Sequence, residues 1–416
     1  MAPSLLEGTE LLGQAAGSGF KEPPFLVRRR DGQVIQLSQL LYAIAGCMDG
    51  RSLEEAAEAV ATQLDMRVSP EHIAYAAEQK LAPLGLVSRR DGRIFAPQAR
   101  TALLALRFRA GIVPESCVNA AARVLAPLFV GPLVLAALLA LTACDVWLVA
   151  SHSVSRSLST VIRSPTLLLG LTGVTILSLA FHECGHAAAC RYGGARPGRI
   201  GVGIYLVWPV FFTDVTDSYR LSRAGRLRTD LGGVYFNALL AVVAAVGYRV
   251  TGYTPIVIVA VGQQLLIIDQ FVPWIRLDGY HIVSDVIGVP DLFDRIRPVM
   301  RSLLPGRPSD ARVTELKRSA RVAVSIWVLT TVVTLSAMAA VVVVNAPGYL
   351  RQAWQSLVVQ VDTVGAGARI GSVIDVLNGA VGTIMLLLPV IGMTLTYLVI
   401  CRGVGTSLAA HGARQS

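Results

Sequence analysis

Charged residues are scarce in this chain, and their scarcity excludes an ordinary soluble protein. Of 416 residues only 15% are charged while 53% are hydrophobic, whereas soluble globular domains contain about 25% charged residues. With a mean hydropathy of +0.58, the composition predicts a polytopic membrane protein with a soluble part. The net charge of +10 does not indicate nucleic-acid binding, because the arginines cluster beside apolar stretches, where anionic lipid and topology explain them. We expect a lipid bilayer as partner and no nucleic acid.

The six cysteines lack the spacing of a redox or metal motif. They form no CxxC pair and no disulfide-like pattern, and several lie in apolar stretches, so they are expected to be small buried side chains. The N-terminus also lacks a basic segment followed by an apolar core. No cleaved signal peptide is therefore expected, and the N-terminal part is predicted to stay in the cytoplasm.

The N-terminal quarter predicts a small domain of mixed structure. A flexible leader is predicted over residues 1–23. A domain is predicted over residues 24–95, and it opens with two short strands around an Asp31–Gly32 turn. Three helices follow, with a capping box formed by Ser52 and Glu55 at the start of the second. Their predicted ranges are 38–47, 52–64 and 70–84, and a closing hairpin is predicted over 85–94.

This domain resembles a known class of peptide-recognition domain. The order of elements, the segment Asp49-Gly-Arg-Ser-Leu-Glu-Glu55 and the segment Leu84-Gly-Leu-Val87 are similar to the winged-helix domains called RiPP recognition elements. The resemblance implies that a precursor peptide binds as an added strand at the sheet edge. The alternative is a cytosolic domain that binds something else or only packs on the membrane part.

The remainder predicts a membrane domain. A linker or amphipathic segment is predicted over residues 96–127. The membrane domain is predicted over residues 128–403, and a cytoplasmic tail over residues 404–416. Six apolar stretches are each near the length of a membrane-spanning helix. They lie at about 128–150, 166–189, 231–248, 255–272, 322–344 and 377–400. The predicted fold class is mainly α, a six-helix membrane core with a small N-terminal α+β winged-helix-like domain.

The positions of Arg and Lys predict the orientation in the membrane. The loop after the second stretch carries seven of them and the loop at 274–321 carries nine, whereas the alternate loops carry two, one and two. Because cytoplasmic loops are enriched in positive residues, both termini are predicted to be cytoplasmic in a multi-pass protein of a bacterial-type cell membrane. The end of the second stretch then lies near the cytoplasmic face.

That end contains His182, Glu183 and His186. Residues four apart share a face of a helix, so both imidazoles can bind one metal ion, while Glu183 can reach a metal-bound water. The pattern indicates a zinc hydrolase, which usually requires a third protein ligand. Asp278 is the favoured third ligand, because it follows the fourth stretch at the same membrane depth and Gly279 allows the chain to bend. His281 is the competing candidate.

Two motifs together resemble a known enzyme family. His182-Glu-Cys-Gly-His186 and Leu277-Asp-Gly-Tyr280, with the segment Pro209 to Ser218, are similar to the site-2 protease family of intramembrane zinc metalloproteases, in its bacterial branch of peptide zinc metalloproteases. The resemblance covers about residues 165–290. It implies that His182, His186 and Asp278 bind Zn²⁺. It also implies that Glu183 is the general base and then the proton donor, which agrees with zinc lowering the pKa of its water to about 7.

The same family commonly has a glycine turn and an asparagine in the third stretch, and Gly233 and Asn237 fit those places. This chain has Gly-Val-Tyr where Gly-Pro is more usual. Asn237 is predicted either to steady the substrate or oxyanion, or to bond a neighbouring helix. Residues 195–218 predict a β-rich re-entrant hairpin whose edge aligns an extended substrate.

The motifs do not assign a single role to three other acidic residues. Asp214 and Asp217 are rival zinc ligands or, more in keeping with nearby arginines, ion-pair partners, and Asp145 in the first stretch has no assigned role. The leading functional hypothesis is a zinc endopeptidase that matures a ribosomally made peptide near the cytoplasmic membrane face. The alternatives are a non-proteolytic peptide-binding or export component, and a regulated intramembrane protease of a signalling protein. The sequence indicates neither the substrate nor the oligomeric state.

Overall fold

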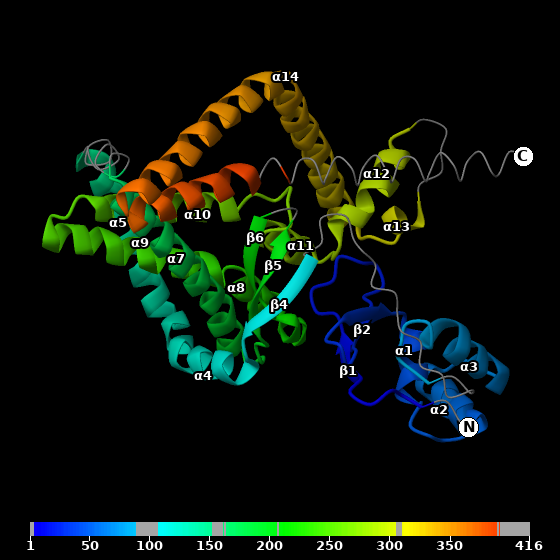
Figure 1. The fold of residues 1–416 in the computed structure, drawn as a ribbon. Coiled ribbons are helices and arrows are strands. Elements are labelled where there is room, and N and C mark those ends of the chain that lie inside the picture. Colours follow the sequence, from blue (N-terminus) through cyan, green and yellow to red (C-terminus); the bar gives the residue numbers. More distant parts are fainter. Residues whose placement is uncertain are drawn as a thin grey trace, which may run out of the picture. The chain divides into compact units, whose positions relative to one another are not determined.

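The computed structural model describes residues 4–88, 107–151, 161, 164–205, 208–304, 310–388 and 391. The protein is mainly helical, as its composition and sequence pattern predict (Figure 1). It forms two compact units. The described part of the first unit comprises residues 4–88, 216–227, 283–304 and 310–330. The described part of the second comprises residues 107–151, 161, 164–205, 208–215, 228–282, 331–388 and 391.

The first unit opens with a three-stranded antiparallel sheet. β2 (Phe25–Arg28) lies between β1 (Glu10–Gln14) and β3 (Val34–Leu37). β2 and β3 form the predicted hairpin, and Gly32 in its turn has a φ of 83°, a conformation that favours glycine. The prediction of two strands around Asp31–Gly32 is confirmed.

β1 differs from the flexible leader predicted over residues 1–23. Leu11 pairs with Val27 across the sheet, and the backbone N–H of Gly13 donates a hydrogen bond to the Tyr42 hydroxyl at 3.0 Å. Phe20 is buried. The order of this segment comes from partners elsewhere in the unit, which its small polar residues do not reveal.

Three short helices follow the sheet. They are α1 (Gln39–Gly46), α2 (Leu53–Leu64) and α3 (Pro70–Ala76), and a π-helical turn over Ala77–Leu81 extends the last. Each helix begins at a serine N-cap, and the predicted capping box of α2 is present. Their buried faces share one core with the sheet, which includes Val27, Ile44, Val60, Ile73 and Leu81. Residues 89–94 of the predicted closing hairpin lie outside the described residues.

Shorter elements complete the first unit. They are η3 (Thr216–Arg220), η4 (Leu292–Arg295), α12 (Ile296–Ser302) and α13 (Ala311–Thr314). α8 (Arg223–Asp230), α11 (Asp278–Ile287) and α14 (Arg318–Ile370) contain boundaries between the units.

The second unit contains its own three-stranded antiparallel sheet. Its order is β4 (Arg107–Val113), β5 (Ile200–Tyr205), β6 (Trp208–Thr213). β5 and β6 form the predicted hairpin. The segment predicted over 96–127 as a linker or amphipathic segment contains β4 and α4 (Glu115–Leu125) and the start of the 3-10 helix η2 (Ala126–Phe129). Its residues 96–106 lie outside the described residues. β4 and α4 are integrated in the unit, because strand pairing and a buried apolar face hold them there.

Within the described residues, four helices are long and apolar enough to cross a membrane. They are α5 (Gly131–Ser151), α7 (Pro165–Tyr192), α9 (Gly232–Thr251) and α14. α10 (Pro255–Gln270) and a helix over Val373–Leu388 are apolar but shorter. The 16 residues of α10 extend about 24 Å, short of a hydrocarbon core of about 30 Å. The predicted count of six membrane-spanning helices is therefore not confirmed. Residues 389–390 and 392–400 of the last stretch, and the predicted tail over 404–416, lie outside the described residues.

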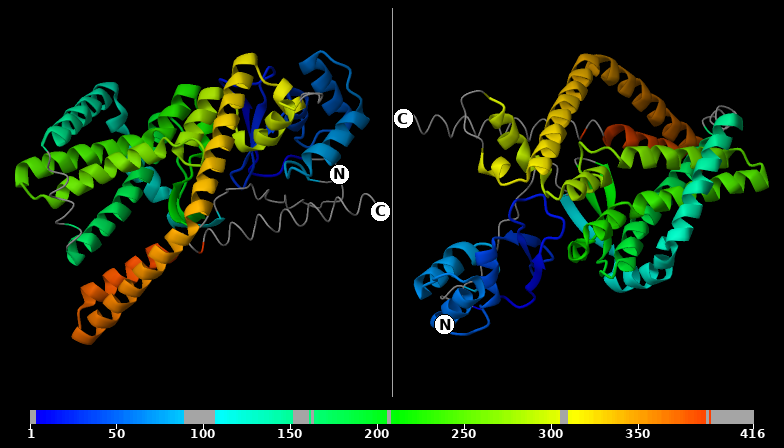
Figure 2. Two further views of the ribbon diagram at one scale, coloured as in Figure 1. Left: turned by 90° about the horizontal axis from the view of Figure 1, so that it is seen from above. Right: turned by 180° about the vertical axis from the view of Figure 1, so that it is seen from behind.

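α14 is longer than the helix predicted over 322–344. It has 53 residues and continues to Ile370, through the segment that was predicted to be a loop. Pro347 lies inside it, and Figure 1 shows α14 changing direction part way along, as an internal proline commonly causes. The helix over Val373–Leu388 then returns beside the end of α14 (Figure 2), with Gly379 and Gly382 against Gln360.

α7 and α9 pack closely because glycines face each other. A Cβ on Gly185 would overlap the carbonyl oxygen of Gly232, and a Cβ on Gly232 would meet the Gly185 carbonyl. Beside this contact, Phe236 is fully buried and its ring centroid lies 4.6 Å from that of Phe181. Small residues at such crossings let helix backbones approach in apolar surroundings. The packing fixes the part of α7 that carries the two histidines.

Candidate metal centre

His182, Glu183 and His186 lie in the last part of α7, which ends at Tyr192. As predicted from their spacing, the two imidazoles share one face of the helix. Their Nε2 atoms are 3.1 Å apart and their ring centroids 4.8 Å apart. Both side chains are buried, with exposed fractions of 4% for His182 and 8% for His186.

Asp278 at the start of α11 completes this group. Its Oδ2 lies 3.2 Å from Nε2 of His182 and 3.3 Å from Nε2 of His186. Gly279 allows this position, because a Cβ there would lie 2.6 Å from the backbone carbon of Phe271. His281, the competing candidate, is exposed, and the group within the described residues contains His182, His186 and Asp278 without it.

The donor set fits zinc. The three ligand atoms lie within 4.8 Å of one another, and two imidazole nitrogens with a carboxylate oxygen are ordinary zinc ligands. Nδ1 of His186 lies 2.8 Å from the carbonyl oxygen of Thr229. Because a carbonyl only accepts hydrogen bonds, Nδ1 carries the proton and the Nε2 lone pair is directed to the metal position.

The Asp278 carboxyl group is held in its charged form. Burial by itself raises the pKa of Asp278, but the neighbouring His186 and His182 imidazoles more than offset that effect and lower the pKa below its ordinary range. A carboxylate must be ionised to bind a metal ion.

Glu183 lies beside the ligand group and is 9% exposed. Its Oε2 accepts a hydrogen bond from the hydroxyl of Thr213, the last residue of β6, at 2.7 Å. No sequence motif indicates a role for Thr213 or Thr229. Their contacts join residues 30 and 43 positions apart, and no local pattern marks such pairs.

α9 brings Gly233 to the site, and Asn237 follows four residues later on the same face of this helix. A Cβ on Gly233 would overlap the imidazole of His182, so glycine allows this ring to lie against the helix. Asn237 is 1% exposed, and neither Nδ2 nor Oδ1 has a hydrogen-bond partner in the described part of the chain. A buried amide without partners is costly, and a bound ligand would satisfy it. The alternative prediction, a bond from Asn237 to a neighbouring helix, is not supported within that part.

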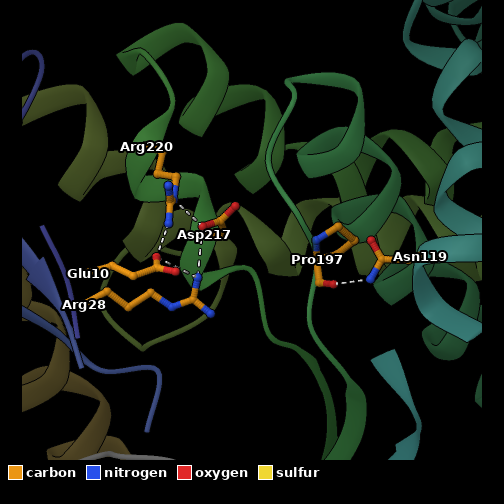
Figure 3. A network of polar contacts seen from close by, with 6 residues as sticks. All are labelled: Glu10, Arg28, Asn119, Pro197, Asp217 and Arg220. Atoms are coloured by element: carbon orange, nitrogen blue, oxygen red, sulfur yellow. Dashed lines mark hydrogen bonds and ion pairs between the residues drawn. The ribbon is translucent and has the colours of Figure 1, made fainter. Parts of the chain in front are cut away.

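The remaining acids have other surroundings. Asp217 belongs to an ionic cluster of the first unit, with its Oδ1 3.1 Å from Nη1 of Arg28 and 2.6 Å from Nε of Arg220 (Figure 3). The ion-pair prediction for Asp217 is confirmed. Glu10 joins the cluster through Arg220. Asp145 accepts a hydrogen bond from Gln264 at 2.6 Å, which provides the partner that the sequence could not identify.

Asp214 continues the β5–β6 hairpin in the second unit. Its backbone N–H donates to the carbonyl of Arg199 at 3.0 Å, and its own carbonyl accepts from Gly198 at 2.7 Å. Nearby, the Asn119 amide donates to the Pro197 carbonyl at 2.8 Å, which ties α4 to the segment before β5 (Figure 3). Within the described residues, neither Asp214 nor Asp217 belongs to the group of potential metal ligands.

Comparison of the chain with models of protein families, with curated proteins and with solved structures gave no match. The functional interpretation therefore depends on the residues of the site and their geometry.

Proposed function

We propose that this protein is a zinc-dependent endopeptidase of the site-2 protease type, acting within or at a membrane. The observation that carries the proposal is the convergence of His182, His186 and Asp278 beside the Glu183 carboxylate. Histidines four apart on a helix, with a glutamate after the first, are the arrangement used by zinc peptidases. A third ligand from a distant segment makes the arrangement specific.

Each residue has a distinct role in this reaction. His182, His186 and Asp278 would hold zinc, which supplies Lewis acidity toward the scissile carbonyl and lowers the pKa of water at the site to about 7. Glu183 accepts a proton from the attacking water and later donates it to the leaving amine. The Asn237 amide, which lacks a partner in the described part of the chain, donates to the carbonyl oxygen as negative charge develops there.

β6 provides the surface that receives the substrate backbone. Among the described strands, β5 pairs with both β4 and β6, while β6 pairs with β5 alone. Its second edge is therefore unpaired, and Thr213 at its end contacts Glu183. An extended peptide added at this edge would form main-chain hydrogen bonds beside the metal centre.

The membrane placement follows from the long apolar helices. α5, α7, α9 and α14 meet the length and composition of spans, and the Arg-rich loops favour a cytoplasmic location for both termini and the metal centre. The substrate is a peptide or a membrane protein. The N-terminal sheet and helices, which resemble a winged-helix peptide-recognition domain, would capture a precursor peptide for maturation.

Zinc content and hydrolysis, measured together, test this function. Full-length protein in detergent should contain a single zinc ion and should cleave dye-labelled casein or an apolar helical peptide in micelles. Glu183→Gln should retain zinc and lose cleavage, and 1,10-phenanthroline should abolish wild-type cleavage. Equal cleavage by wild type and Glu183→Gln would refute the proposal. Zinc binding without hydrolysis of either probe would instead favour a non-proteolytic binding or export component.

A further inference from the structure

Thr213 makes a close contact with Glu183 that the roles given above do not use. Its Oγ1 lies 2.7 Å from Oε2 of the Glu183 carboxylate and 3.0 Å from the Glu183 backbone oxygen. Both distances are those of hydrogen bonds from a hydroxyl. The side chain and the backbone of the same glutamate therefore lie against one threonine.

The Glu183 carboxylate has no positively charged Lys or Arg partner within the described residues that could orient it. It is also buried. A buried carboxylate requires hydrogen bonds to offset its lost hydration. The contact from Thr213 engages Oε2 of this carboxylate.

The backbone of Thr213 is held in place by the sheet. Thr213 pairs with Ile200 at the start of β5, and the two hydrogen bonds between Asp214 and the segment Gly198–Arg199 extend this pairing by one step. A hydroxyl on such a strand end has a defined position. The sheet is thereby linked to the carboxylate through one side chain.

We infer that Thr213 is a positioning residue that orients the Glu183 carboxylate toward the water it activates. The inference rests on the proposed peptidase function and goes beyond it. It gives β6 two roles, to receive the substrate backbone and to orient the carboxylate of the general base, Glu183. Within the described residues, Thr213 is not among the potential metal ligands. Its effect passes through Glu183, and loss of the hydroxyl lets the carboxylate rotate away.

Thr213→Val tests the inference because valine keeps the β-branched shape and removes only the hydroxyl. Thr213→Ser retains the hydroxyl and serves as the rescue variant. Thr172→Val is the matched control, since the Thr172 hydroxyl donates to the Leu168 carbonyl of its own helix at 3.0 Å and has no other hydrogen bond within the described residues. All variants are made in the full chain and checked for zinc content. One readout is casein cleavage, with kcat separated from KM.

The second readout is the dissociation constant of acetohydroxamate, a zinc-binding probe that also requires a well-placed glutamate carboxylate. Thr213→Val should lower kcat by about tenfold or more, as loss of orientation in general-base catalysis does, with KM and zinc content unchanged. Hydroxamate affinity should fall by a similar factor. Thr213→Ser should recover most of both, and Thr172→Val should match wild type.

A double-mutant cycle separates positioning from a general structural effect. In a Glu183→Gln background, Thr213→Val should cause no further loss of hydroxamate affinity, because the group it positions has been changed. Wild-type kcat and hydroxamate affinity in Thr213→Val would overturn the inference and leave the peptidase function intact. Absence of zinc and cleavage in the wild-type protein would refute the peptidase function, and this inference with it.

Discussion

In the first unit, several acids are paired with arginine, whereas the acids of the metal centre in the second unit are not. Asp285 lies 2.8 Å from buried Arg226, and Asp217 is shared by Arg28 and Arg220. In contrast, neither Glu183 nor Asp278 forms an ion pair with Lys or Arg in the described part of the chain. Asp278 instead faces two histidines.

This difference distinguishes acids that serve the stability of the fold from acids that serve the metal centre. Arginine neutralises an acid permanently and contributes to stability. In the metal centre, the carboxylates of Glu183 and Asp278 are not neutralised by Lys or Arg within the described residues. A buried charge of this kind is unfavourable unless a cation or a substrate compensates it. We therefore expect changes in the first unit to alter stability and changes in the second to alter metal binding and rate.

The largest effect is expected for His186→Ala. Removal of one of the three ligands should reduce zinc content to a small fraction of the protein and reduce cleavage to background. Metal analysis and casein cleavage measure both. His72→Ala is the matched control, since His72 is an exposed histidine of α3 in the first unit. Equal zinc loss in both variants would contradict the assignment of metal binding to the second unit.

Asn237→Ala should lower kcat by about a hundredfold, the order observed when a donor to a developing oxyanion is removed. Zinc content should not change, because Asn237 is not a ligand. The readout is kcat at saturating substrate, together with metal analysis. An unchanged kcat with reduced stability would instead show that Asn237 is a packing residue of α9.

Asp285→Asn should destabilise the protein by about 2 kcal/mol, since it leaves buried Arg226 without its carboxylate partner. Chemical denaturation in detergent measures this change. Zinc content should remain that of wild type. The exposed pair of Asp49 and Arg51, 2.6 Å apart, provides the control, and Asp49→Asn should leave the denaturation midpoint unchanged. A loss of zinc in Asp285→Asn would contradict the assignment of this pair to stability.

Gly233→Ala should weaken zinc affinity by about tenfold, as displacement of a ligand by its surroundings commonly does. The added Cβ would overlap the His182 ring. Gly247→Ala, also in α9, is the matched control, because a Cβ there would meet Ile256 at an ordinary 3.9 Å. Competition with a chromophoric chelator measures both affinities. Equal affinities would mean that His182 can shift without cost.

Local sequence patterns predicted much of the candidate site. Helical periodicity placed His182 and His186 on one face, and the order of apolar stretches selected Asp278, which the structure brings to them. The capping box at Ser52 marks a helix start that the structure retains. Each of these signals depends on residues near one another in the chain or on a repeated pattern.

The features that were not predicted depend on distant partners. β1 and β4 are strands because β2 and β5 supply their hydrogen bonds. Thr213 and Thr229 contact the site only once the fold brings them to α7. Pro347 favours a helix end in the sequence, yet α14 continues past it. Tertiary context decides each of these cases, and a single sequence contains no local record of it.

The most direct test of the central claim compares the two units through one aspartate from each. Zinc content should be measured by elemental analysis in wild type, Asp278→Ala and Asp217→Ala, all purified under the same conditions. The account predicts a single zinc ion in wild type and in Asp217→Ala, and marked loss of zinc in Asp278→Ala. Full zinc content and unchanged zinc affinity in Asp278→Ala would contradict the account.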